Sequence, residues 1–172
     1  MEQVLERSKE ILQTTPSRWE SLVEQVHPDL LFLAPAAGEW SAIECLQHLV
    51  DTESVFQFRV HCFMEGRDFP AFDPDAALEP STNRPDPAEL AAAFSRMRTQ
   101  SLNVLLAVSD QDLERRVRHQ ELGPVSLEEM IHEWAAHDLN HTIQAERALM
   151  QPFIRGSGPW QRYFTSHMIA GE

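Results

Sequence analysis

The sequence predicts an all-α protein, a single four-helix bundle that spans residues 1–172. Three observations predict this fold class. Apolar residues recur at helical spacing in long segments, two of those segments open with a capping box, and no segment shows the clear alternation of a half-buried strand. A chain of this length can bury one hydrophobic core without disulfides. We therefore expect amphipathic helices packed side by side.

Two helices are expected at the amino-terminal end, over residues 2–13 and from Thr15 to about residue 26. Thr15 can cap a helix, and Pro16 suits a first helical position because that position needs no N–H donor. The sequence therefore predicts that one helix stops and another starts here. Residues 27–40 contain Pro28, Pro35 and Gly38 and are expected to form a connection.

The clearest helix start is the capping box of Ser41 and Glu44, which predicts a helix to about residue 65. Its apolar stripe is formed by Cys45, Leu46, Leu49, Phe56, Val60 and Phe63. His48 lies at the margin of that stripe. Glu53 falls inside the stripe, where a carboxylate needs a hydrogen-bonding or cationic partner.

Residues 66–86 contain four prolines and no clear period, so we expect a long connection. Connections of this length are often functional, and this one could line or cover a pocket. Asp86 as cap and Pro87 as first residue predict the next helix, which runs to about Val108.

A second polar connection is expected over about 109–125, and the capping box of Ser126 and Glu129 opens the last long helix, to about residue 150. The tail holds a short aromatic segment at residues 160–164. This segment could pack on the bundle or on a second subunit, and the sequence does not choose between them.

Composition excludes several classes of function. The net charge of −13 argues against nucleic-acid binding, which needs clustered Lys and Arg. No window approaches the roughly 20 apolar residues of a membrane span, and the amino-terminus lacks the pattern of a signal peptide. Cys45 and Cys62 lie too far apart on one predicted helix for a disulfide. These features indicate a cytoplasmic protein with free thiols.

His137 and His141 are four residues apart, so they share one face of the last long helix. A buried imidazole needs a partner, and a metal ion is one good partner. The pair alone is weak evidence in a chain with 8 His, because satisfied core histidines would give the same spacing. His132 is five residues from His137, so no His-Glu-x-x-His protease motif is present.

Taken in order, several motifs resemble the DinB/YfiT-like family across roughly residues 8–150. They are Thr15-Pro16, Trp40-Ser41 with Glu44, His48-Leu49 with Glu53, and His137-Asp138-x-x-His141-x-x-Gln144. The resemblance implies an up-down-down-up bundle, usually a homodimer, with a divalent metal held by His48, His137 and His141. Three neutral imidazoles suit zinc, nickel or ferrous iron and leave positions for water or substrate.

Members of that family include metal-dependent thiol S-transferases that use bacillithiol or mycothiol, a thiol-dependent isomerase and proposed hydrolases. The resemblance therefore implies a transferase or hydrolase acting on a small-molecule substrate, with a low-molecular-weight thiol as a possible cofactor. A non-catalytic, stress-related metal- or ligand-binding protein is the rival hypothesis. A purely structural dimer without metal is the third.

Glu53 is the one candidate catalytic residue, as a base or as a hydrogen-bond acceptor beside the metal. A structural hydrogen bond within the bundle explains Glu53 more simply. For Asp138, which also falls on the inward face, a hydrogen bond between helices is as good an explanation as a chemical role. Gln144, one turn beyond His141, is a further candidate. The remaining histidines are expected to be solvated or at helix ends; they are His27, His61, His119, His132 and His167.

Overall fold

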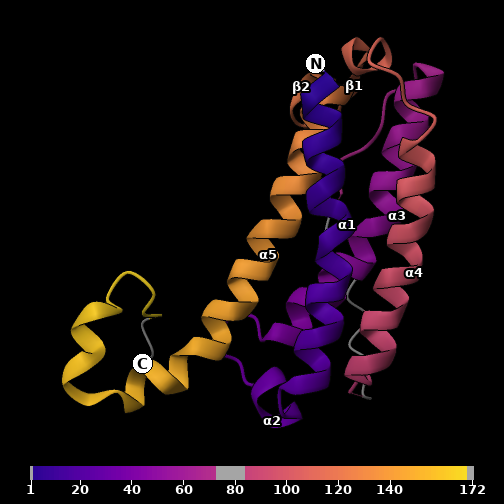
Figure 1. Cartoon of the computed structure of the whole chain (residues 1–172). Coiled ribbons are helices and arrows are strands. Elements are labelled where there is room, and N and C mark those ends of the chain that lie inside the picture. Colours follow the sequence, from indigo (N-terminus) through magenta and orange to yellow (C-terminus); the bar gives the residue numbers. More distant parts are fainter. Residues whose placement is uncertain (1, 73–83, 170–172) are drawn as a thin grey trace.

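A computed structural model of the chain describes residues 2–72 and 84–169. Four long helices make up the bundle, and Figure 1 shows α1 and α5 running in one direction and α3 and α4 in the other. This is the predicted up-down-down-up four-helix bundle, and the predicted fold class is confirmed. The bounds of the four helices are α1 Glu2–Gln25, α3 Ala42–Glu65, α4 Pro87–Leu105 and α5 Leu127–Gly156.

The predicted break at Thr15-Pro16 is wrong, because α1 is one continuous helix with Pro16 inside it. Proline cannot donate a hydrogen bond to the carbonyl four residues back, which belongs to Leu12. That carbonyl instead accepts a hydrogen bond from Arg98 Nη1 of α4, at 2.9 Å. A tertiary contact thus replaces the missing helical bond, and this contact is invisible in the local sequence.

The predicted capping boxes are confirmed. At the start of α3, the backbone N–H of Ser41 donates to Glu44 Oε2 at 2.7 Å, and the Glu44 N–H donates to Ser41 Oγ at 3.4 Å. Ser126 and Glu129 form the same reciprocal pair before α5. These caps fix where the histidine-bearing helices begin, and therefore which residues face the interior.

Helix ends are predicted less well than helix starts. The helix α4 ends at Leu105 rather than Val108, and α5 continues past residue 150 to Gly156 with Pro152 inside it. The expected connection at 27–40 includes a short helix, α2 Pro28–Leu31. Of the long connection at 66–86, residues 73–83 lie outside the described part of the chain.

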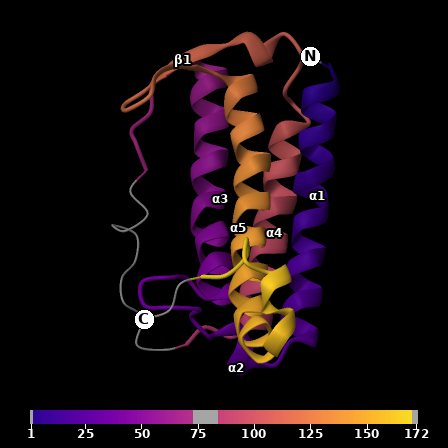
Figure 2. The same ribbon diagram turned by 90° about the vertical axis from the view of Figure 1, so that its left-hand side faces the viewer.

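The absence of strands is a second wrong expectation. A 3₁₀ turn, Asp112–Glu114, leads into the antiparallel strands β1 Arg116–His119 and β2 Gly123–Ser126. Figure 2 shows β1 at the end of the bundle where α3 ends and α5 begins. Phe69 joins this hairpin, since its N–H donates to the Arg118 carbonyl at 3.2 Å. Strands of four residues show too little alternation to be recognised in a sequence.

A buried polar layer crosses the middle of the bundle, between two hydrophobic clusters. One cluster packs near the hairpin and includes Leu12, Phe56 and Trp134. The other lies toward α2 and includes Trp19, Leu46 and Phe94. Each long helix contributes buried polar residues that fall between these clusters in sequence; they are Thr15, Thr52, Glu53, Arg98, Ser101, Asp138, His141 and Thr142.

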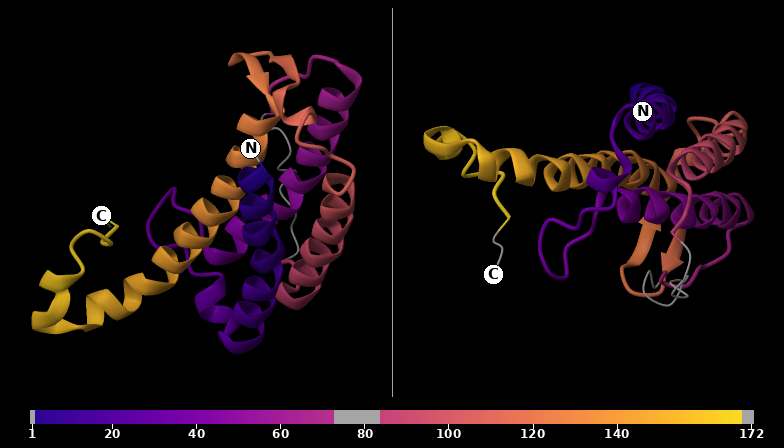
Figure 3. Two further views of the ribbon diagram at one scale, coloured as in Figure 1. Left: turned by 45° about the horizontal axis from the view of Figure 1, so that its top comes forward. Right: turned by 90° about the horizontal axis from the view of Figure 1, so that it is seen from below.

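The carboxyl-terminal part of α5 projects away from the other three long helices, as the two views of Figure 3 show. A 3₁₀ helix, Gly158–Tyr163, follows it. None of the helices in the described part of the chain could span a bilayer, since each is too short or too polar. Cys45 and Cys62 are buried free thiols, as expected.

Candidate metal centre

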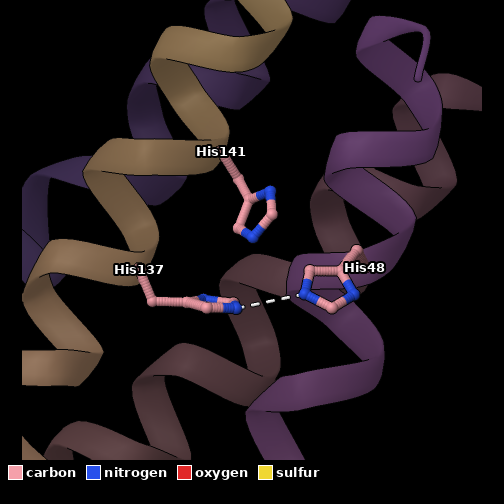
Figure 4. Close-up of side chains that lie close together, drawn as sticks. All are labelled: His48, His137 and His141. Atoms are coloured by element: carbon pink, nitrogen blue, oxygen red, sulfur yellow. Dashed lines mark hydrogen bonds between the residues drawn. The ribbon is translucent and has the colours of Figure 1, made fainter. Parts of the chain in front are cut away.

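The three histidines singled out in the sequence lie together at mid-bundle. Figure 4 shows His48 on α3 facing His137 and His141, which stand one turn apart on α5. One nitrogen of each ring can be chosen so that all three nitrogens lie within 4.8 Å of one another. His141 is 9% exposed, and the other two histidines are half-buried. The antiparallel packing of α3 and α5 thus brings residues 89 positions apart into one cluster.

The spacing suits a single cation. The Nε2 atoms of His48 and His137 lie 3.1 Å apart. Two imidazole nitrogens that each lie about 2.1 Å from one ion, at bond angles of roughly 90–110°, would be about 3.0–3.4 Å apart. The donor set of three imidazoles is one that zinc, nickel and ferrous iron accept. The residues present therefore fit a divalent metal.

The three rings are held in the neutral form that metal ligation requires. Burial lowers the pKa of His48 to about 4, and the nearby His141 adds to this shift. Burial lowers the pKa of His137 to about 3, with further contributions from the other two histidines and from Arg98 and Arg59. Burial also lowers the pKa of His141, against the opposing hydrogen bond to Gln144. At neutral pH each ring offers a lone pair.

His141 is oriented by two neighbours. Its Nδ1 lies 2.9 Å from Gln144 Oε1, an oxygen that can only accept, so the proton sits on Nδ1 and Nε2 is free to bind a metal. The Trp40 ring stacks on the His141 ring at 5.8 Å between centroids, with an angle of 23° between the planes. In contrast, the buried Nδ1 of His137 has no hydrogen-bond partner among the described residues.

Glu53 takes part in a buried ion pair. Arg98 Nε donates to Glu53 Oε1 at 2.7 Å, and Nη2 donates to Oε2 at 2.8 Å. The same guanidinium donates to both carboxylate oxygens of Asp138 at 2.6 and 2.9 Å. All three side chains are 1% exposed. The partner that Glu53 requires is therefore Arg98, and the structural interpretation accounts for both carboxylates.

A cavity of about 340 Å³ adjoins the histidines between α3, α5 and the hairpin. His48 and His137 form part of its wall. The other lining residues are Thr52, Val55, Phe56, Arg59, Phe69, Phe72, His119, Glu121, Leu122, Val125, Glu129, Met130 and Glu133. This volume suits a small-molecule site. Phe69 and Phe72 belong to the long connection, so its described part does line a pocket.

A family model of the DinB superfamily matches residues 11–145. The chain belongs to the DinB superfamily. Among solved structures it is similar to YfiT from Bacillus subtilis, with a TM-score of 0.73 and 19% sequence identity over 87% of each chain. YfiT is described as a probable metal-dependent hydrolase with an unusual four-helix bundle topology. A comparison with curated proteins finds no match. The predicted resemblance is confirmed, and the three-histidine cluster fits a metal site in this superfamily.

Three ionisable residues of this DinB protein's cavity were not singled out in the sequence. Arg59 follows His48 by eleven residues, or three helical turns, and Glu133 precedes His137 by one turn. Each therefore lies on the same helix face as a histidine, a signal that could have found both. His119 was expected to be solvated or at a helix end; it is buried in β1 instead. No sequence pattern places this residue beside α3.

Proposed function

We propose that this protein is a divalent-metal-dependent enzyme that acts on small molecules, most directly as a hydrolase. The observation that carries the proposal is the cluster of three neutral imidazoles, two of which, His48 and His137, line the adjoining cavity. His48, His137 and His141 would hold the metal. When bound, a divalent cation supplies Lewis-acid activation of a water molecule or a thiol. The similarity of fold to YfiT, described as a probable hydrolase, supports the choice of reaction.

Glu133 is the residue suited to accept a proton in this reaction. It lines the same cavity as His137 and lies one turn before it on α5. Burial raises the pKa of its carboxyl, and the field of Arg59 partly offsets this rise. A carboxylate with a raised pKa is a better proton acceptor near neutral pH. Among the described residues, its oxygens form no hydrogen bond or ion pair, so they are available to accept a proton.

The test uses protein loaded separately with zinc, nickel and ferrous iron. Small carboxylic esters and amides probe hydrolysis, and a low-molecular-weight thiol with an electrophilic aryl halide probes S-transfer. We expect hydrolysis that disappears in His141→Ala and falls about 100-fold in Glu133→Gln. Glu146→Gln, at an exposed glutamate on the same helix that does not line the cavity, is the matched control and should retain full activity.

Each outcome distinguishes one hypothesis. Thiol transfer without hydrolysis would favour the S-transferase alternative. Bound metal with turnover no higher than that of His141→Ala would favour the non-catalytic metal-binding protein. Absence of metal binding under all three loading conditions would contradict the proposal itself.

A further inference from the structure

We propose that Arg59 anchors the carboxylate of a small amphipathic acid in the cavity, so that the substrates are monoanions with an apolar body. This inference rests on the proposed function, because it identifies the substrate class of the same site. It is carried by the surroundings of one guanidinium group and by the composition of the cavity wall.

Arg59 lies in the middle of α3 and is half-buried. Its guanidinium carbon is 5.3 Å from the centroid of the Phe69 ring and 5.9 Å from that of Phe56. Cation–π contacts of this kind hold a guanidinium in place through its delocalised charge. Among residues 2–72 and 84–169, none of its five N–H groups has an acceptor. The side chain is thus positioned, but its hydrogen-bonding capacity is unused within this part of the chain.

Among the described residues, no carboxylate oxygen lies within 4.0 Å of the Arg59 guanidinium, and no hydrogen bond is formed by it. Arg98, which is buried near the histidines, differs from Arg59 because all five of its N–H groups have acceptors. These acceptors are Glu53, Asp138 and the Leu12 carbonyl. Burial lowers the pKa of Arg59, and the charge of Glu133 offsets this only in part, so partly burying this cation without a hydrogen-bond acceptor is costly. A bound anion would remove that cost at Arg59.

His119, which lines the same cavity, offers a second donor. The Nδ1 atom of His119 accepts from the backbone N–H groups of Glu121 and Leu122, at 3.1 and 3.3 Å. Its proton must therefore be on Nε2, which makes that atom a donor. The Phe69 ring contacts both His119, at 5.4 Å between centroids, and Arg59. Two donors are thus held around one aromatic ring.

The rest of the wall determines the remaining chemistry of the ligand. Phe56, Phe72 and Met130 give the cavity apolar surface for a hydrocarbon or aryl body. His48 and His137 line the same cavity, so a ligand held at Arg59 would extend toward the histidines. A volume of about 340 Å³ is at the small end of ligand sites. The substrate is therefore a small molecule with an acidic end and an apolar body.

The acidic residues of the cavity limit the ligand to one negative charge. Glu129 Oε2 accepts from the Ser126 backbone, so this carboxylate is committed to the helix cap. Glu133 and Glu121 also lie on the wall, and neither forms an ion pair among the described residues, although the charge of Arg59 lowers the pKa of Glu133. Their repulsion disfavours a dianion such as a phosphate ester, whereas a carboxylate brings a single charge. One arginine matches one carboxylate.

The experiment measures binding to metal-free protein, with phenylacetate as the probe and phenylacetamide as its neutral counterpart of the same shape. Titrations followed by NMR should show phenylacetate binding at least about tenfold more tightly than phenylacetamide. Arg59→Met and Arg59→Gln should abolish this preference, and Arg59→Lys should retain part of it. Arg67→Met is the matched control, since Arg67 also lies over a phenylalanine ring, that of Phe58, but is exposed and outside the cavity.

Equal affinity of the wild-type protein for the acid and the amide would overturn the proposal, and so would no detectable binding of phenylacetate. These two comparisons need no variant to fold. An unchanged preference in folded Arg59→Met would overturn it as well. Because all of these titrations are made without metal, a failure of metal binding or of turnover would count against the proposed function alone.

Discussion

At the scale of single residues, the three imidazoles differ in what holds each ring. The Gln144 side chain accepts a hydrogen bond from Nδ1 of His141 and so fixes which ring nitrogen carries the proton. The buried Nδ1 of His137 has no hydrogen-bond partner among the described residues. A hydrogen bond to the far nitrogen orients a ligand and raises its basicity. Gln144 should therefore contribute to metal affinity without touching the metal.

Replacing Gln144 by leucine should weaken metal binding about 10–100-fold, because His141 loses the acceptor that sets its tautomer. Isothermal titration of metal-free protein with zinc measures this change. Gln47→Leu is the control, since Gln47 is a half-buried glutamine of α3 whose side chain donates to Asp51 rather than to a histidine. Equal losses in the two variants would show that Gln144 has no specific role.

The depressed histidine pKa values also predict a pH dependence of stability. The pKa of His48 is about 4 in the folded chain against an ordinary value of 6.5. Between these values the unfolded state binds more protons, so the free energy of unfolding must decrease as the pH falls through this range. Metal-free protein should thus be less stable at pH 5 than at pH 7.

Urea unfolding at both pH values measures the effect. His48→Gln removes one titrating ring, so this variant should lose about 1 kcal/mol less than wild type, after allowance for solvent screening of a half-buried group. His61→Gln, an exposed position on the same helix, should behave as wild type. Indistinguishable pH profiles for wild type and His48→Gln would contradict the account.

At the scale of helices, Arg98 of α4 forms hydrogen bonds with the other three long helices. Its guanidinium bonds to Glu53 of α3, to Asp138 of α5 and to the Leu12 carbonyl of α1. The last of these contacts lets α1 pass through Pro16 without a break. Burial lowers the pKa of Arg98, whereas its two carboxylate partners raise it. The combined effect of the carboxylates is larger, so the pKa lies above its ordinary value.

Arg98→Met should destabilise the protein by about 3–5 kcal/mol, because it leaves two buried carboxylates without a cation. Chemical denaturation at pH 7 measures the loss. Arg96→Met, an exposed position on the same helix, should change stability by less than about 0.5 kcal/mol. Adding Glu53→Gln and Asp138→Asn to Arg98→Met should recover part of the loss. A decrease below about 1 kcal/mol in Arg98→Met would contradict this role.

At the scale of the whole molecule, the end of α5 and the segment after it project away from the bundle (Figure 3), and they carry exposed aromatic side chains. Phe153 and Trp160 are both 65% exposed, and Tyr163 is 64% exposed. Apolar surface grouped in this way is typical of protein contacts. We propose that this surface forms the homodimer that the sequence resemblance implies.

We expect the wild-type protein to elute as a dimer in size-exclusion chromatography with light scattering. The double variant Phe153→Ser/Trp160→Ser should shift it to a monomer, because both side chains would lose their contacts in the interface. Leu106→Ser is the control, since Leu106 is 73% exposed but follows α4 at the other end of the bundle. A dimer that persists in the double variant would place the interface elsewhere.

The elements that the sequence predicted well have their determinants close together in the chain. Ser41 with Glu44, Asp86 with Pro87, and Ser126 with Glu129 each fix a helix start within four residues. The features that were missed depend on distant contacts. Pro16 stays helical because of Arg98, and the hairpin forms where Phe69 can join it.

The same distinction separates the parts of the site. His137 and His141 could be paired from their spacing, and the family resemblance added His48. The cavity could not be predicted, because its wall combines α3, α5, the hairpin and Phe69, which only the folded chain brings together. The partner of Glu53 is 45 residues away, so the sequence could show the need for a cation but not its identity.

Metal analysis of protein purified without added metal tests the central claim most directly. If His48, His137 and His141 form one coordination centre, wild-type protein should carry about one divalent ion per chain, and His137→Ala should carry almost none. His61→Ala, which removes an exposed histidine, should match the wild type. Equal metal content in wild type and folded His137→Ala, or no metal in the wild type even after incubation with zinc, nickel and iron, would contradict the account.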